Sequence, residues 1–440
     1  MKCLIIAAGK GSRLYQKGNP KPLVPILGVP LIERVIRSAL EAGMDDFYVV
    51  TGFKGEKVRL FLDDLALKRH TKITHVINEA WEEGNALSVL KAEKHLKEKF
   101  VLLMADHLFD VDILKDLKGQ PLGEGEIALA VDLDTSNCLA RLDDVTKVEF
   151  KEEKVVNIGK NIKEFNAFDT GIFLSSPVIF QGIKESISKS GDSALSSAVR
   201  LLASRGRVKA FKTQGKFWVD VDDPEALDKA EDYLLRHLKG KPADGPVARY
   251  INRPLSLRIS RHLAKTPVTP NQISLAAFLI SLLAAALFMV GGYITLALGG
   301  LLAQLASIVD GCDGEISRLK FQASPFGGWF DAVLDRYADA FLLFGLTWHA
   351  YGKNPQDAVM AVGFLAIIGS FMLSYTADKY DGLMRERIKP GRSLRLGRDM
   401  RLFLIFLGAL LNLPFLTLII IAVIMNAETV RRVIVCQSHG

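Results

Sequence analysis

The chain has 440 residues, of which 49% are hydrophobic, and it carries a formal net charge of +7. This length exceeds that of one ordinary domain, so two or three domains are expected. Charge is unevenly distributed, because no charged side chain occurs between Gln272 and Val309 while residues 1–235 are rich in charge. The positive excess is typical of the cytoplasmic loops of a membrane protein and does not indicate nucleic-acid binding. The four cysteines form no CxxC pair, which argues against a structural zinc site or a disulfide framework.

Residues 1–235 alternate short apolar runs, which predict strands, with amphipathic segments, which predict helices. The predicted strands are residues 3–7, 46–50, 75–77, 100–104 and 127–131, and the predicted helices are residues 31–42 and 84–96. Strands that alternate with helices favour a layered α/β domain with a mainly parallel sheet. The first apolar run lacks a signal-peptide cleavage site and is therefore interpreted as a strand.

A glycine-rich turn follows the first predicted strand, with the sequence AAGKGSR at residues 7–13. Such a turn exposes backbone N–H groups that bind phosphates. The pattern differs from a dinucleotide-binding fingerprint, which requires a third glycine where Leu14 stands. The turn therefore indicates phosphate binding without specifying the ligand.

The same turn, together with Lys21-Pro22-Leu23, resembles the nucleotidyltransferases that attach a nucleoside monophosphate to a sugar phosphate or to choline phosphate. The resemblance implies a Rossmann-like α/β fold for residues 1–235. It also implies that Arg13 and Lys21 are catalytic residues that hold the triphosphate and the departing pyrophosphate. The residues of the turn that would bind the nucleotide are Ala8, Gly9 and Gly11.

Further positions fit this resemblance. Asn85 and Ser88 resemble the family's nucleotide-base segment. Asp106, which follows the apolar run VLLMA, and Asp220, within WVDVD, resemble its two ligands for Mg²⁺ or Mn²⁺. Each aspartate alone is equally compatible with an ordinary carboxylate at the end of a strand, whereas the combination favours a catalytic site.

The resemblance also predicts two residues that bind the alcohol substrate. Asp169, in Asp169-Thr170-Gly171, resembles the family's sugar-side strand, and Lys160 would contact a phosphate. Both are expected to bind the phosphorylated alcohol.

Residues 236–271 form a predicted linker and juxtamembrane segment. The sequence GKPADGP is rich in residues that break helices and strands. Residues 246–268 interleave basic and apolar positions, which suits an amphipathic segment on an anionic membrane surface. The alternative is a plain solvated helix.

Residues 272–440 predict an all-α membrane domain with six crossings. The predicted crossings are residues 272–290, 293–317, 329–350, 357–376, 400–413 and 414–428. The loops with Arg318 and with residues 385–401, and the tail with Arg431, are basic and fall on one side, whereas Lys353 is one of few charges on the other. This asymmetry places residues 1–235 in the cytoplasm.

Four aspartates occur within the second and third predicted crossings. Asp310 and Asp313 are three residues apart and Asp331 and Asp335 are four apart, so each pair shares a helix face. A charge deep in a bilayer costs roughly 2.5–3.5 kcal/mol, so four would cost on the order of 10 kcal/mol. A hard cation such as Mg²⁺, Mn²⁺ or Ca²⁺ would offset this. The alternative is a set of helix-end carboxylates that are paired with arginines in headgroup water.

The spacing of these aspartates resembles the signature of the CDP-alcohol phosphotransferase family. Every position matches except Ser317, where the family usually has Ala. The resemblance implies metal binding by Asp310, Asp313 and Asp331, with Asp335 also at the metal and acting as the base for the acceptor hydroxyl. It further implies that three residues, Gly314, Arg318 and Gly327, contact the CDP-alcohol.

The acceptor of such an enzyme would bind beside the membrane. The loop from residue 385 to residue 401 is dense in arginine, and we expect Arg392, Arg395 and Arg398 to bind an acceptor phosphate through bidentate contacts. The alternative is the ordinary excess of positive charge in a cytoplasmic loop.

The two halves together suggest that the first makes the donor that the second consumes. This pairing resembles the bifunctional enzymes of archaea and thermophiles that make di-myo-inositol phosphate, which implies CTP and inositol 1-phosphate as substrates. Two alternatives are a phospholipid synthase with an unrelated or regulatory first half, and a nucleotide-sensing or transport protein. Helix bundles of this kind often pair, so a homodimer through the membrane domain is an alternative to a monomer.

Overall fold

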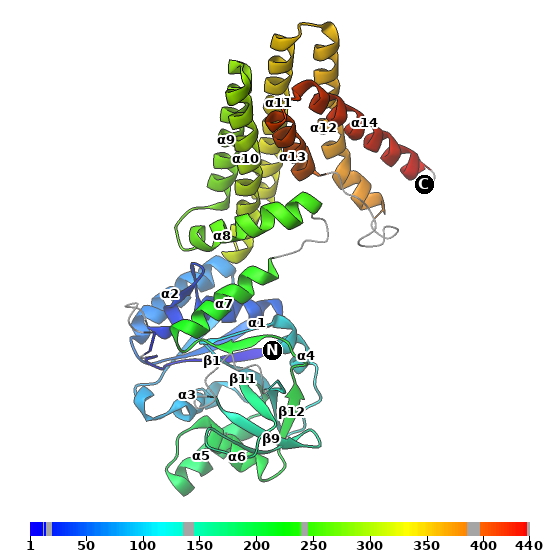
Figure 1. The fold of residues 1–440 in the computed structure, drawn as a ribbon. Helices are drawn as coiled ribbons and strands as arrows, with labels where there is room; N and C mark the ends of the chain where they lie inside the picture. The colour runs from blue at the N-terminus through cyan, green and yellow to red at the C-terminus, as the bar shows by residue number, and fades with distance from the viewer. Residues whose placement is uncertain (12, 15–19, 135–144, 239–244, 385–396, 438–440) are drawn as a thin grey trace. The chain divides into compact units, whose positions relative to one another are not determined.

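The computed structural model describes residues 1–11, 13–14, 20–134, 145–238, 245–384 and 397–437 (Figure 1). The chain divides into two compact units, Met1–Tyr233 and Leu234–Gly440, which we call the head unit and the helical unit. The division falls within helix α7 (Pro224–His237).

The described part of the head unit is built on a nine-stranded sheet with the order β5-β4-β1-β6-β11-β8-β12-β10-β9. Its strands are β1 (Lys2–Ala7), β4 (Asp46–Thr51), β5 (Lys72–Ile77), β6 (Phe100–Met104), β8 (Ile127–Asp132), β9 (Lys147–Lys151), β10 (Lys154–Gly159), β11 (Ala167–Ser175) and β12 (Val208–Lys212). Two small ribbons pair β2 (Pro25–Ile26) with β3 (Val29–Pro30) and β7 (His107–Phe109) with β13 (Trp218–Asp220).

Helices cover both faces of this sheet (Figure 1). They are α1 (Leu31–Glu41), α2 (Gly55–Arg69), α3 (Asn85–Lys91), α4 (Val111–Lys118), α5 (Val178–Ser190) and α6 (Leu195–Ala203), together with α7. Side chains of β1 alternate between two buried apolar clusters, with Ile5 in the cluster of α1, α2 and α4 and Leu4 in that of α3, α5 and α6. This period of two is the pattern of a strand buried on both faces.

The predicted strands all occur, but the sheet is mixed and not mainly parallel. Strands β5, β4, β1 and β6 are parallel, as are β8 and β12, whereas β11 runs antiparallel to β6 and to β8. Strands β9 and β10 form a hairpin whose two turn residues, Glu152 and Glu153, both have positive φ. Glycine or asparagine usually marks such a turn, so Glu-Glu gave no hairpin signal. The predicted helix 84–96 is also shorter, since α3 ends at Lys91 and a 3-10 turn, Glu93–His95, follows.

The helical unit contains α8 (Arg253–Leu263), α9 (Pro270–Val290), α10 (Tyr293–Leu319), α11 (Pro325–Lys353), α12 (Asp357–Met384), α13 (Arg398–Leu410) and α14 (Pro414–Gln437). Helix α9 begins with a capping box between Thr269 and Gln272 and with Pro270 in the first turn. Gly291 and Gly292 both have positive φ and form the tight turn into α10. The pair α9 and α10 therefore packs as neighbours.

Within the described residues, three helices are long and apolar enough to cross a membrane, Pro270–Val290, Tyr293–Leu319 and Asp357–Thr376. Helix α13 has 13 residues and is about 20 Å long, which is shorter than a bilayer's hydrocarbon core of about 30 Å. The count of six crossings therefore stays a prediction.

Helix α8 is fixed to α10 by buried polar contacts. Arg253 forms an ion pair with Glu315 at 2.8 Å, and the Ser256 hydroxyl donates to the same carboxylate at 2.7 Å. Asn252 donates to Ser307 at 3.0 Å. These contacts hold the last turns of α10, which carry Asp310 and Asp313, against the juxtamembrane segment.

Candidate active sites

A cleft of about 710 Å³ lies in the head unit. Among its lining residues are Gly9, Arg13, Asn85, Lys160, Asp106 and Asp220, all of which the sequence predicts to be functional. The lining also includes Asp169 and Gly171 of β11. The cleft thus brings together residues that are more than 200 positions apart in the chain, as expected for a site at the carboxyl ends of β1 and β6.

Strand pairing assembles the acidic part of this cleft. Asp106 and His107 follow β6, and β13 pairs with β7 so that Asp220 lies opposite His107. The Val221 N–H donates to the Asp106 carbonyl at 2.9 Å, which extends this pairing by one step. Asp106 and Asp220 are consequently held in one place by backbone hydrogen bonds.

Lys21 lies among three carboxylates of the cleft. Its ammonium is 2.6 Å from Asp106, 3.5 Å from Asp220 and in direct contact with Asp222. Burial alone would lower the pKa of Lys21, but the three negative charges outweigh it and raise that pKa above its usual value. Lys21 therefore stays protonated at neutral pH, beside three carboxylates of the cleft.

His107 is a residue that sequence reasoning missed. Its Nδ1 lies 2.8 Å from Asp106, and its donor atoms, with those of Asp106 and Asp220, all lie within 4.8 Å of one another. Burial would lower the pKa of His107, but the charges of Asp220 and Asp106 raise it to about 9. The available signal was its position directly after Asp106 at the end of an apolar strand.

The carboxylate oxygens of Asp106 and Asp220 fit a divalent cation, because Mg²⁺ and Mn²⁺ prefer oxygen ligands, whereas the imidazole of His107 is a ligand that suits other metals. Burial also raises the pKa of Asp220 to about 6, while Lys21 and His107 hold the pKa of Asp106 well below its usual range despite burial. A cation would relieve the repulsion between the two carboxylates.

The remaining predicted residues of the head unit differ in where they lie. A side chain at Gly11 would collide with Lys21, so this glycine permits the turn to pass the lysine closely. Ala8 is buried and its carbonyl accepts a hydrogen bond from the Phe53 N–H at 3.0 Å. Asn85 lines the cleft and accepts from the Leu195 N–H at 2.8 Å. Ser88 does not line the cleft, and its hydroxyl accepts from Asn78 at 3.0 Å.

The second group of carboxylates lies in the helical unit. Donor oxygens of Asp310 on α10 and of Asp331 and Asp335 on α11 lie within 4.8 Å of one another. One oxygen of Asp331 is buried without a hydrogen-bond partner. An orphaned carboxylate oxygen beside two other carboxylates fits a hard cation.

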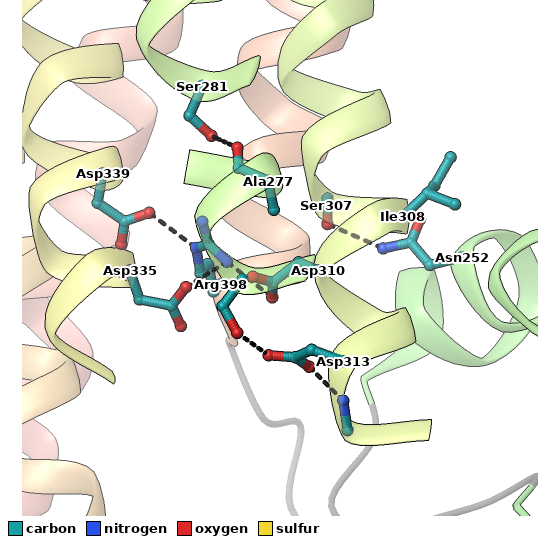
Figure 2. A network of polar contacts seen from close by, with 12 residues as sticks. Asn252, Ala277, Ser281, Ser307, Ile308, Asp310, Asp313, Asp335, Asp339 and Arg398 are labelled. Carbon is teal, nitrogen blue, oxygen red and sulfur yellow. Dashed lines mark hydrogen bonds and ion pairs between the residues drawn. The ribbon is translucent and has the colours of Figure 1, made fainter. Parts of the chain in front are cut away.

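Asp313 takes a different position from the other three aspartates of the signature. One of its oxygens accepts from the Ser274 hydroxyl at 2.6 Å, and the other accepts from the Gly314 N–H. Figure 2 shows Asp313 apart from Arg398, on the turn of α10 that follows Asp310. Metal binding by Asp313 stays a prediction, as does its sharing of a cation with Asp331.

Arg398 lies at the centre of the aspartates (Figure 2). Its Nη1 forms ion pairs with Asp310 at 2.8 Å and with Asp335 at 2.5 Å. Arg398 begins α13, whereas Arg392 and Arg395, the other predicted acceptor-binding arginines, lie outside the described residues. The structure thus brings one predicted acceptor contact directly to the predicted base.

The other signature residues surround the end of α10 and the start of α11. A side chain at Gly314 would lie 3.3 Å from a guanidinium nitrogen of Arg318. The Gly327 N–H donates to Ser324, the N-cap of α11, at 3.0 Å. Both glycines therefore lie at positions where the backbone comes close to a neighbour.

Two family models match the chain. A MobA-like NTP transferase domain matches residues 3–142, and a CDP-alcohol phosphatidyltransferase domain matches residues 267–435. A protein of Rubrobacter xylanophilus named bifunctional IPC transferase and DIPP synthase is 38% identical over 436 residues, which are 98% of this chain and 95% of that protein. The chain belongs to this family.

A second relative over the whole chain carries the same name, and two further proteins are similar to one half of the chain each. The Thermococcus kodakarensis protein of that name is 34% identical over 100% of this chain and 98% of its own length. The archaetidylinositol phosphate synthase of Pyrococcus horikoshii is 32% identical over 42% of this chain and 90% of its own length. The solved inositol-1-phosphate CTP transferase from T. maritima has a TM-score of 0.48 at 28% identity and covers 52% of this chain and 93% of its own.

The family assignment confirms the two resemblances seen in the sequence. The chain is an enzyme with a Rossmann-like nucleotidyltransferase head and a helical CDP-alcohol phosphotransferase domain. Each domain contains one of the two groups of acidic residues described above.

Proposed function

We propose that this chain makes CDP-inositol and uses it. In the head, CTP and inositol 1-phosphate give CDP-inositol and pyrophosphate. In the helical unit, CDP-inositol and a second inositol 1-phosphate give a phosphorylated di-myo-inositol phosphodiester and CMP. The observation that carries this proposal is the pairing, in one chain, of two separate carboxylate groups. One lies in the head unit, where Asp106 but not Asp220 falls within the matched residues 3–142, and the other lies within the matched residues 267–435.

For the head reaction, a phosphate oxygen of inositol 1-phosphate attacks the α-phosphorus of CTP, and pyrophosphate leaves. Arg13 lines the cleft and Lys21 lies behind it against Asp106, and the two cations stabilise the triphosphate and the leaving pyrophosphate. Asp106 and Asp220 would hold Mg²⁺ or Mn²⁺, which neutralises charge on the phosphates. Asn85 and the glycine turn bind the nucleotide, and Asp169 and Lys160 bind the phosphorylated inositol.

For the transfer reaction, a hydroxyl of the acceptor attacks the phosphorus that carries inositol, and CMP leaves. Asp335 accepts the hydroxyl proton. Asp310, Asp313 and Asp331 would hold Mg²⁺ or Mn²⁺, which withdraws charge towards the leaving CMP. Arg398 binds the phosphate of the acceptor, because a guanidinium matches a phosphate through two parallel N–H donors.

We further propose a multi-pass membrane protein with the head in the cytoplasm. The apolar helices α9 and α10 and the basic loops support this topology. A cytoplasmic head has direct access to CTP and to soluble inositol 1-phosphate. The helical unit would be embedded in the lipid bilayer. A homodimer formed through the helical unit is compatible with this topology.

A second candidate function is phospholipid synthesis from a CDP-linked lipid. The similarity of the helical unit to the archaetidylinositol phosphate synthase of Pyrococcus horikoshii favours it. The cytidylyltransferase-type head argues for the main proposal. If the helical unit used a CDP-linked lipid as its donor, the CDP-alcohol made by the head would have no use in this chain.

The deciding experiment supplies purified chain and Mg²⁺ with either CTP and inositol 1-phosphate or a CDP-linked lipid and inositol 1-phosphate. The proposal predicts pyrophosphate, then CMP and a phosphodiester by mass spectrometry, in the first mixture. Silence in the first mixture together with CMP release in the second would show that the chain is a lipid synthase.

A further inference from the structure

Asp339 lies one helical turn beyond the signature of the CDP-alcohol phosphotransferases, and none of the roles above uses it. Because Asp331, Asp335 and Asp339 are spaced by four residues, they share one face of α11. Asp339 is nevertheless the most enclosed of the three carboxylates that contact Arg398, with only 3% of its surface exposed. A carboxylate buried so completely must be paired.

Three side chains from two other helices satisfy Asp339. One carboxylate oxygen accepts from Nε of Arg398 at 3.3 Å (Figure 2). The other accepts from Nη2 of Arg401 at 2.6 Å and from the Ser370 hydroxyl at 3.1 Å. Asp339 therefore joins α11 to α12 and α13 at the level of the aspartate group.

The buried ion pairs of Asp339 with Arg398 and Arg401 would be an unfavourable way to gain stability alone. The loss of hydration on burying an ion pair is often only partly offset by the attraction between the charges. Apolar residues in the same place often give equal stability. Arg398 is also the first residue of α13, where the helix dipole disfavours a cation. These two costs indicate that the position of the guanidinium serves function.

Different nitrogens of the Arg398 guanidinium contact different carboxylates. Its Nη1 faces Asp310 and Asp335, which belong to the group that can hold a cation, whereas its Nε is bound to Asp339, which does not. Asp339 is thus the partner that remains to Arg398 when Asp310 and Asp335 engage other ligands. Arg401, which is 3% exposed, in turn fixes Asp339 from the far side.

We propose that Asp339 is a positioning residue for phosphoalcohol transfer, which holds Arg398 beside Asp335 in the orientation that binds the phosphate of an anionic acceptor. This inference rests on the proposed function, since it assumes a phosphorylated acceptor. It assigns Asp339 no contact with the reacting atoms. Its effect on the reaction passes through Arg398.

The test is Asp339→Asn in the full-length chain in detergent, supplied with CDP-inositol and varied inositol 1-phosphate. The amide keeps the shape of the side chain but cannot form the ion pairs. We expect the KM for inositol 1-phosphate to rise about tenfold or more, because orienting partners of this kind typically contribute that much. The KM for CDP-inositol should change less than about twofold, and pyrophosphate release by the head should be unchanged.

A double-mutant cycle shows whether Asp339 acts through Arg398. In an Arg398→Gln background, Asp339→Asn should raise the acceptor KM by no further factor. Independent, multiplying effects of the two substitutions would contradict the proposal, as would equal effects on both KM values. Ser370→Ala removes one contact to Asp339 and gives a milder version of the test if Asp339→Asn does not fold.

Glu428→Gln is a matched control. Glu428 on α14 also binds two arginines, Arg431 at 2.7 Å and Arg432 at 3.1 Å, and is partly buried. This variant should leave the acceptor KM unchanged. If the unaltered chain makes no phosphodiester from CDP-inositol at all, the proposed function is wrong; if it does and Asp339→Asn leaves the acceptor KM unchanged, only the role of Asp339 is wrong.

Discussion

The head unit and the helical unit each gather three aspartates around one cation, but they hold that cation differently. In the head, Lys21 contacts Asp106, Asp220 and Asp222 and lies in a 3-10 turn near a glycine loop. In the helical unit, Arg398 starts a helix and is oriented by a carboxylate that is itself bound to Arg401.

The chemistry of the two cations accounts for this difference. An ammonium is a compact charge with three rotatable donors, so it tolerates partners that move, such as a departing pyrophosphate. A guanidinium is a planar fork that binds phosphate well only when it is correctly oriented. In both units a third carboxylate outside the possible metal group contacts the cation and a further arginine. In the head, Asp222 lies 4.0 Å from Arg13 and its side chain is 42% exposed, whereas Asp339 in the helical unit is 3% exposed and is held by Arg401 at 2.6 Å.

The largest effect is expected from removal of the predicted base, which should inactivate one site and leave the other active. Asp335→Asn should lower CMP release from CDP-inositol by roughly 100- to 10,000-fold, because a general base contributes about that much. Pyrophosphate release from CTP should be unchanged, so CDP-inositol should accumulate. Parallel assays of pyrophosphate and CMP measure this, and a loss of both activities would contradict two separate sites.

Asp106→Ala should have the opposite pattern. Without this carboxylate, Lys21 loses its 2.6 Å partner and the head loses one oxygen ligand for a cation, so pyrophosphate release should fall about 100-fold or more. Supplied CDP-inositol should still yield CMP at the normal rate. Failure of that rescue in a folded variant would show that the two halves are not independent.

The difference between the two cations is tested by Arg398→Lys. The charge remains, but the fork and its Nε contact with Asp339 are lost. We expect kcat/KM for inositol 1-phosphate to fall roughly tenfold, as for the loss of one charge-assisted hydrogen bond of about 1.5 kcal/mol. Full activity in this variant, measured by CMP release at low acceptor concentration, would mean that a point charge suffices at this site too.

The smallest effect concerns the stability of the head. Burial raises the pKa of Asp169 to about 6, above its value of about 3.9 in an unfolded chain. Between these values the folded state keeps the proton that the unfolded state has lost, so stability falls as pH rises from about 4 to 6, by at most about 3 kcal/mol.

Asp169→Asn removes this pH-dependent penalty while keeping an oxygen that accepts from the Gly171 N–H. Relative to the unaltered chain, the variant should be more stable at about pH 7 than at about pH 4.5. Thermal unfolding of both full-length chains in detergent and chelator at the two pH values measures the difference. If the stability difference between the variant and the unaltered chain were the same at both pH values, the raised pKa of Asp169 would be contradicted.

Much of the fold was predictable, because it depends on local pattern. Apolar runs located the strands of the head, and the spacing of Asp310, Asp313, Asp331 and Asp335 indicated a CDP-alcohol phosphotransferase. The hairpin of β9 and β10 was missed because its turn at Glu152 and Glu153 adopts positive φ without glycine or asparagine. The antiparallel pairing of β11 with β6 and β8 joins segments far apart in the chain, which local pattern does not reveal.

The missed site residues depend on tertiary contacts that spacing does not contain. His107 gains its partner Asp220 only through pairing of β7 with β13, across more than 100 positions. Asp339 continues the stripe of Asp331 and Asp335, but its link to Arg398 and Arg401 requires α13 to lie against α11. A sequence pattern shows which face of a helix is acidic, but not which cations will meet it.

The central claim, that one chain holds two independent sites linked by CDP-inositol, is tested most directly by mixing two inactive variants. Asp106→Ala cannot make CDP-inositol, and Asp335→Asn cannot use it. Supplied with CTP, inositol 1-phosphate and Mg²⁺, neither alone should yield the phosphodiester, whereas their mixture should yield it, as followed by mass spectrometry. A mixture that yields no phosphodiester, although each variant retains its own half-reaction, would contradict the account.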